Sequence, residues 1–170
     1  MSYKCIQKLP YSIHRIHRMT VLRDGTFASN TFYDDKTIQI WKQNDDMKWK
    51  CIQTLIGHTN RVSSLIVLPD STLASSSDDY TIKIWKQNDD MKWECVQTLI
   101  EPEPTNGINS LIVLHDNTIA TSSWNNTIKI WKQGKDMKWK CIQTIIEYTQ
   151  HNQHNRPSYQ LYRLTILPNN

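Results

Sequence analysis

The sequence predicts an all-β fold built from repeated four-stranded antiparallel sheets, and three observations lead to this prediction. The stretch WKQNDDMKWKCIQT at 41–54 returns at 85–98 and 131–144, and each later copy differs from the first at two of fourteen positions. Short segments such as TIKIWK alternate apolar with polar residues, which is typical of strands. Turn-forming Asp, Asn, Gly and Pro residues separate these segments.

The repeat has a period of about 45 residues, and its middle copy shows how each strand is predicted. An apolar run ends at a Pro-Asp turn, a Leu-Ala-Ser segment follows, and two further segments flank a polar hairpin. The strands expected in this copy lie at 62–68, 72–77, 81–86 and 93–100. A lone four-stranded sheet buries little apolar surface, whereas such sheets packed face to face around an axis bury both faces. The repeat therefore predicts β-propeller blades.

The two ends of the chain add one strand each. YKCIQKL at 3–9 matches a fourth strand, and LYRLTIL at 161–167 matches a first strand. We therefore expect one propeller segment over 1–170, with complete blades at approximately 12–56, 57–100 and 104–146 and with these two orphan strands. A closed propeller has about four to eight blades, and open blade edges invite further pairing. The chain is then a truncated member of a longer propeller, an imperfect four-position ring, or a unit that self-associates to close a ring; we favour these in that order.

One segment resembles a known repeat. IGHTNRVSSLIVLPDSTLASSSDDYTIKIW at 56–85 is similar to a WD-repeat unit, with its Gly-His, Pro-Asp, Leu-Ala-Ser and Ile-Trp elements. The resemblance implies a β-propeller that presents surfaces to protein partners, without catalysis or a cofactor of its own. It also implies a tetrad of hydrogen-bonded side chains that ties loops to strands. By motif position this structural tetrad maps onto His58, Ser77, Asp79 and Trp85.

The departures from the family pattern limit the tetrad to the middle copy. Lysine replaces the Asp of the Trp-Asp dipeptide in all three copies, at 42, 86 and 132, and Asn125 stands where Asp is expected. A His–Asp–Ser set also allows a hydrolase hypothesis with His58, Ser77 and Asp79 as its residues. The spacing fits the structural tetrad better, and no oxyanion-type glycine motif accompanies Ser77.

Composition excludes several classes of function. The net charge of +4 is small and its lysines are spread by the repeat, so we expect no nucleic-acid binding. The apolar runs are too short to span a membrane, and MSYKCIQKLP has no apolar signal core, so we expect a cytoplasmic protein. The His pairs lack further ligands at metal spacing, so no metal is expected. One cysteine position is copied four times, which predicts reduced thiols rather than pairs: Cys5, Cys51, Cys95 and Cys141.

The copies diverge mainly in two sets of loops. In the family's geometry the fourth-to-first loops and the second-to-third turns lie on one face of the propeller, here called the variable face. Rigidly held loops are where binding residues usually lie, so we hypothesise a protein- or peptide-binding site there; the alternative is that the loops simply tolerated drift. The candidate residues are Arg15, His17, Asp34, Arg61, Ser63, Asp78, Asn109 and Trp124. We expect Arg61 and Trp124 to contribute most to binding, because Arg and Trp are enriched at binding hot spots.

A tryptophan begins each fourth strand, at Trp49, Trp93 and Trp139. The first interpretation is packing between blades. The second is a repeated stacking platform, as in a carbohydrate-binding, lectin-like propeller, and it supplies the alternative function.

Overall fold

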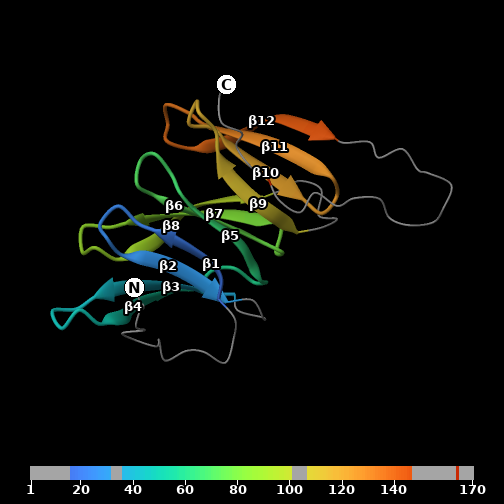
Figure 1. Ribbon diagram of the computed structural model, residues 1–170. Helices are drawn as coiled ribbons and strands as arrows, with labels where there is room; N and C mark the ends of the chain where they lie inside the picture. The colour runs from blue at the N-terminus through green and yellow to red at the C-terminus, as the bar shows by residue number, and fades with distance from the viewer. Residues whose placement is uncertain (1–15, 32–35, 101–106, 147–163, 165–170) are drawn as a thin grey trace, which may run out of the picture.

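The computed structural model of the protein describes residues 16–31, 36–100, 107–146 and 164, and Figure 1 shows their arrangement. These residues form twelve strands in three antiparallel sheets and contain no helix, which confirms the all-β prediction. Sheet 1 contains β1 (Ile16–Val21), β2 (Phe27–Thr31), β3 (Ile38–Gln43) and β4 (Trp49–Leu55). Within the described ranges, no helix is long and apolar enough to cross a membrane.

The other two sheets repeat this order. Sheet 2 contains β5 (Val62–Val67), β6 (Leu73–Ser77), β7 (Thr81–Gln87) and β8 (Trp93–Ile100). Sheet 3 contains β9 (Ile108–Val113), β10 (Ile119–Ser123), β11 (Thr127–Gln133) and β12 (Trp139–Ile146). Each strand pairs with the next one along the chain, as in a meander. The strands predicted for sheet 2 are all present, with ends that differ by one residue at most.

The three sheets stack face to face, as Figure 1 shows. First strands contact first strands, β1 with β5 and β5 with β9, whereas the fourth strands β4 and β8 meet far less closely. The sheets therefore converge on the side of their first strands, as propeller blades converge on an axis. Among the described strands the stack is open at both ends, which is the arrangement of a partial propeller.

Two apolar cores hold the stack together, one at each junction between sheets. Ile40 and Leu55 from sheet 1 pack with Trp85 and Trp93 from sheet 2 in the first core. The second core is formed by the equivalent positions one repeat later, and it includes Trp131 and Trp139 of sheet 3. Sheet 2 therefore packs against both of its neighbours, although most of β8 is exposed. Packing on both faces suits the consecutive apolar residues 65–67 of β5, whereas β7 keeps the alternating pattern.

The turns between first and second strands share one device. Asp70 Oδ1 accepts hydrogen bonds from the backbone N–H and the hydroxyl of Thr72, at 3.1 and 2.6 Å. Asp24 with Thr26 and Asp116 with Thr118 repeat this pair of bonds. An Asp side chain that bonds its own backbone two residues on fixes a tight turn. The sequence repeat is thus also a repeat of local geometry.

The predicted orphan strand 3–9 lies outside the described residues, as does 161–167 except for Leu164. The backbone N–H of Leu164 lies 3.4 Å from the hydroxyl oxygen of Ser110 and donates to it. Because Ser110 is on β9, this contact brings one residue of the C-terminal segment against the first strand of sheet 3. The boundaries of the repeats and of the single domain stay predictions.

Candidate protein-binding face

A chain of buried hydrogen bonds fixes the loop that precedes sheet 2. The two ring nitrogens of His58 lie 2.9 Å from Asp79 Oδ2 and 2.7 Å from Ser75 Oγ. The indole N–H of Trp85 donates to the same Ser75 hydroxyl oxygen at 2.8 Å. The His58 side chain is fully buried and that of Asp79 is 6 % exposed. The loop is thus tied to β6, to the turn after it and to β7.

The serine of this chain is Ser75, so the prediction of Ser77 was wrong. Ser77 instead donates to the Asn60 carbonyl and accepts from the Asp79 backbone N–H, both at 3.0 Å. Both serines lie on one face of β6, because side chains two residues apart share a face. Trp85 pairs in register with Leu73, two residues from Ser75 and four from Ser77. At about 3.3 Å per residue, its indole reaches only the nearer serine.

Asp79 is held in its ionised form. Burial alone would raise the pKa of this carboxyl, but hydrogen bonds from His58 and Thr81, the charge of His58 and the Thr59 N–H outweigh it. The pKa of Asp79 therefore lies well below its usual value. Every one of these groups has a structural partner, and Ser75 is completely buried, which keeps its hydroxyl away from any substrate. The arrangement is what a structural tetrad requires.

Among the described residues, sheets 1 and 3 keep the tetrad bond from the indole to the second-strand hydroxyl. The Trp41 indole donates to Ser29 Oγ at 2.9 Å, and the Trp131 indole donates to Thr121 Oγ1 at 3.1 Å. A hydroxyl occupies the same position in all three second strands, and this repeated hydroxyl was the sequence signal that pointed to Ser75 rather than Ser77. In sheet 3, Asn125 takes the place of Asp79 and accepts from the hydroxyl of Thr127.

The variable face carries a charged pair at its centre. The Arg61 guanidinium donates through Nε to Asp78 Oδ2 at 2.8 Å, and the Asp78 N–H donates to the Arg61 carbonyl at 2.9 Å. The two side chains are 23 % and 24 % exposed. Arg61 comes from the loop before β5 and Asp78 from the turn after β6. The pair is thus both partly accessible and held in one orientation.

Neighbouring sheets contribute to the same face. Burial, followed by the charges of Arg18 and Arg61, lowers the pKa of His17 on β1, and the opposing charge of Asp78 also acts on it. On the other side, a Cβ added to Gly107 would lie 2.5 Å from the Asp78 Cα, so only glycine permits this approach. The backbone N–H of Trp124 donates to the Gly107 carbonyl at 3.1 Å. Contacts thus run from His17 on β1 through the Arg61–Asp78 pair to Gly107 and the backbone of Trp124.

Four other predicted residues do not join this surface. Ser63 is 1 % exposed, and its hydroxyl donates to the Ile108 carbonyl of sheet 3 and contacts Ser76. Asn109 is also buried. Both predictions were wrong as to accessibility, and Ser63, the second residue of β5, faces sheet 3 rather than solvent. Arg15 and Asp34 lie outside the described residues.

The tryptophans of the fourth strands differ in exposure. Trp93 and Trp139 are 5 % and 4 % exposed, and Trp49 is half-buried. A stacking platform needs an accessible ring face, so the burial of Trp93 and Trp139 favours their interpretation as packing residues. Sequence reasoning missed their polar partners, which are glutamines of the preceding sheet. Gln53 bonds the backbone of Trp93, and Gln97 bonds that of Trp139.

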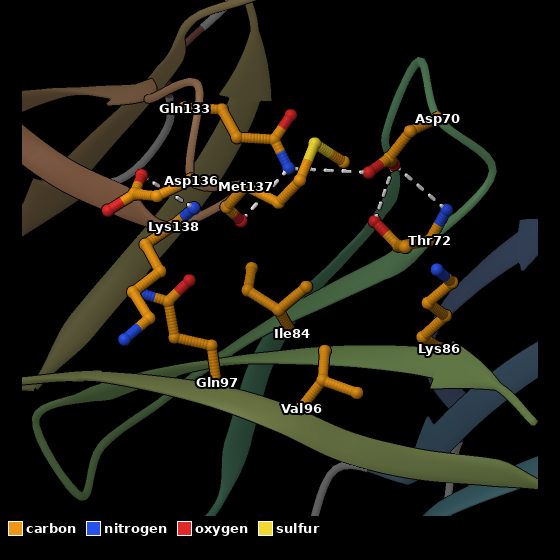
Figure 2. Close-up of a pocket in the computed structure, with 10 residues that line it drawn as sticks. All are labelled: Asp70, Thr72, Ile84, Lys86, Val96, Gln97, Gln133, Asp136, Met137 and Lys138. Atoms are coloured by element: carbon orange, nitrogen blue, oxygen red, sulfur yellow. Dashed lines mark hydrogen bonds between the residues drawn. The ribbon is translucent and has the colours of Figure 1, made fainter.

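A groove lies at the opposite end of the sheets, between sheets 2 and 3, and Figure 2 shows its lining. Its volume is about 330 Å³. Asp70 accepts from Thr72 and, at 3.5 Å, from Gln133, while Asp136 accepts from the Lys138 backbone. These acidic groups already have partners within the groove. The groove is also lined by the hairpin between the third and fourth strands of sheet 3. This hairpin is nearly identical in all copies, so the groove lacks the sequence variation of the variable face.

Comparison with known proteins agrees with this arrangement. A family model described as "WD domain, G-beta repeat" matches residues 49–86 and 93–132. Each match begins at the fourth strand of one sheet and ends in the third strand of the next, so each spans a junction between sheets. No curated protein matches the chain. The matched residues are therefore WD repeats, and the repeated four-stranded sheets are consistent with a WD-repeat family member.

Proposed function

We propose that this protein is a non-catalytic scaffold that binds a protein or peptide partner through its variable face. WD repeats generally mediate interactions between proteins, which supports a protein as the kind of partner. The observation that carries the choice of surface is the Arg61–Asp78 pair, which is partly exposed and fixed by two hydrogen bonds. We also propose that the protein acts in the cytoplasm.

The chemistry of the face suits a polar peptide with an acidic group. The Arg61 guanidinium is a partly exposed cation whose orientation is held by Asp78, and a guanidinium suits a carboxylate partner. Trp124, half-buried in the turn after β10 of the next sheet, supplies an aromatic side chain. Arg and Trp together form the kind of anchor that dominates protein interfaces. Because the two residues come from different sheets, the binding face depends on the stack as well as on its loops.

A double substitution tests the proposal. Arg61→Ala with Trp124→Ala is expected to weaken capture of the partner by roughly 30-fold or more, because the loss of even one hot-spot residue costs about 2 kcal/mol. The measurement is quantitative affinity capture followed by titration of the recovered partner. Thermal unfolding of the variant checks that the sheets remain folded.

The matched control also removes one cation and one apolar side chain, but at the end of the sheets opposite the variable face. Lys86→Ala with Met137→Ala changes two residues of the groove between sheets 2 and 3 and is expected to leave binding unchanged. If the control pair abolishes binding while the Arg61 and Trp124 pair does not, the binding surface is the groove and the proposal is wrong.

A further inference from the structure

The groove between sheets 2 and 3 has an apolar lining that is open to solvent. Ile84, Val96 and Met137 supply this lining, and the volume of the groove is about 330 Å³. Figure 2 shows Ile84 and Val96 pointing from sheet 2 toward the hairpin of sheet 3 that carries Met137. Val96 and Met137 are 57 % and 60 % exposed, whereas Ile84 is buried beneath them. A groove of this size with mostly apolar walls suits a small ligand.

Met137 holds its place in a backbone conformation that disfavours a side chain. Its φ is 59°, in the left-handed region that glycine adopts freely and that a residue with a Cβ adopts at a cost. Met47 and Met91 have φ values of 60° and 61° in the equivalent hairpins. Glycine would suit the turn better, so the reason for a methionine lies in its side chain. A flexible thioether adapts to apolar ligands of irregular shape.

The polar part of the groove carries an excess of positive charge. Lys86 and Lys138 line the groove together with Asp70 and Asp136. Asp136 forms an ion pair with Lys140 at 3.2 Å, so this carboxylate already has its own counter-charge. With Lys140 included, three cations stand against two carboxylates. The excess of one positive charge is complementary to a ligand with one anionic group.

Lys138 is the cation that is placed to receive this anionic group. Figure 2 shows Lys86 on the side of Thr72 and Lys138 on the side of Gln97, with the apolar side chains between them. Asp70 bonds the Thr72 hydroxyl at 2.6 Å and therefore lies on the side of Lys86. Among the residues that the structure describes, the Lys138 ammonium has no ion-pair or hydrogen-bond partner. An anion at Lys138 thus meets an available charge beside an apolar wall.

We propose that this groove binds a small amphiphile with an apolar ring system or chain and one anionic group. The apolar part lies on Ile84 and Val96 and is covered by Met137, and the anionic group pairs with Lys138. Such a pair is stronger beside an apolar wall than in open water, because the local dielectric constant is lower. The site lies at the end of the sheets opposite the variable face, so it is independent of the protein partner proposed above.

Fluorescence titration of the full chain with two dyes tests the apolar part of the site. Anilinonaphthalene sulfonate has an apolar ring system and one anionic group, and phenylnaphthylamine has the same rings without the sulfonate. Met137→Gly is expected to weaken binding of both dyes by roughly tenfold, because it removes the apolar cover of the groove. Its denaturant midpoint should not fall, since glycine adopts this φ without strain.

Met47→Gly is the matched control. It makes the same change at the same φ in the hairpin of sheet 1, before which the described ranges contain no sheet. It is expected to leave the affinity for both dyes unchanged. Equal affinity of wild type and Met137→Gly for both dyes would overturn the proposal.

Lys138→Met tests the charged part, because it keeps the aliphatic stem and removes the ammonium group. It is expected to weaken anilinonaphthalene sulfonate by roughly tenfold, the loss of a charged hydrogen bond, and to leave phenylnaphthylamine unchanged. Equal losses for the two dyes would overturn the pairing with Lys138. Sedimentation should give wild type and Met137→Gly the same mass. A wild-type dimer that Met137→Gly dissociates would also overturn the proposal, since the occupant would then be a second copy.

Discussion

Asp79→Ala is expected to lower the free energy of unfolding by about 3 kcal/mol, because it removes one partner of a buried pair and leaves several donors unsatisfied. The carboxylate contacts His58 at 2.9 Å and accepts from the Thr59 backbone N–H and the Thr81 hydroxyl at 2.8 and 2.6 Å. Denaturant unfolding at pH 7 measures the change. A loss below about 1 kcal/mol, the typical net value of one hydrogen bond, would contradict the account.

Asp79→Asn removes the negative charge of this side chain while keeping nearly its shape. Asn125 fills the equivalent position in sheet 3 and still accepts from Thr127, so the amide is compatible with the turn. Because the pKa of Asp79 is lowered on folding, its ionisation stabilises the folded state above the unfolded pKa of about 3.9. That contribution is lost as the pH falls from there toward the lower folded pKa. The stability difference between wild type and Asp79→Asn should therefore narrow as the pH falls below about 4; a difference that stays constant below that pH would contradict it.

Ser75→Ala is expected to cost about 2 to 4 kcal/mol, because the Trp85 indole and one nitrogen of His58 lose their common partner in a buried site. Ser77→Ala is the control: it removes the same atoms two residues away on the same face. Its cost should be about 1 kcal/mol, since Asn60, whose carbonyl it bonds, is exposed and can bond water. Denaturant unfolding of both variants measures the two losses of stability and shows which serine belongs to the tetrad. A larger loss for Ser77→Ala would restore the original assignment of the tetrad.

The strands of sheet 2 could be predicted from sequence because three signals agree there. The apolar run, the Asp-Thr turn and the alternating TIKIWK segment each indicate the same ends. The structure moved three boundaries by one residue each, at Leu68, Thr72 and Lys86. The first two residues lie in the turn, where the Leu68 N–H donates to the Thr72 carbonyl at 2.8 Å. The local sequence pattern determines where these strands begin and end, and the packing between sheets hardly changes their ends.

The site was harder to predict from the sequence than the strands were, because it depends on contacts between sheets. Ser75 and Ser77 have the same chemistry and face, and only their register with Trp85 separates them. Ser63 looks like an exposed loop residue in the sequence, yet the neighbouring sheet covers it. The hydrogen bonds between the Gln53 side chain and the Trp93 backbone join residues 40 positions apart, which no local pattern shows. The Gln of the WKCIQT segment therefore has a structural role at both junctions of the stack, as Gln53 and as Gln97.

The most direct test of the account is a footprint of the partner on sheet 2. A photo-cross-linking phenylalanine analogue would replace Tyr80, in the turn beside Asp78, or Met91, which is 61 % exposed in the hairpin at the other end of the same sheet. The account predicts cross-links to a protein partner from position 80 and none from position 91. Cross-links from position 91 with none from position 80 would contradict it.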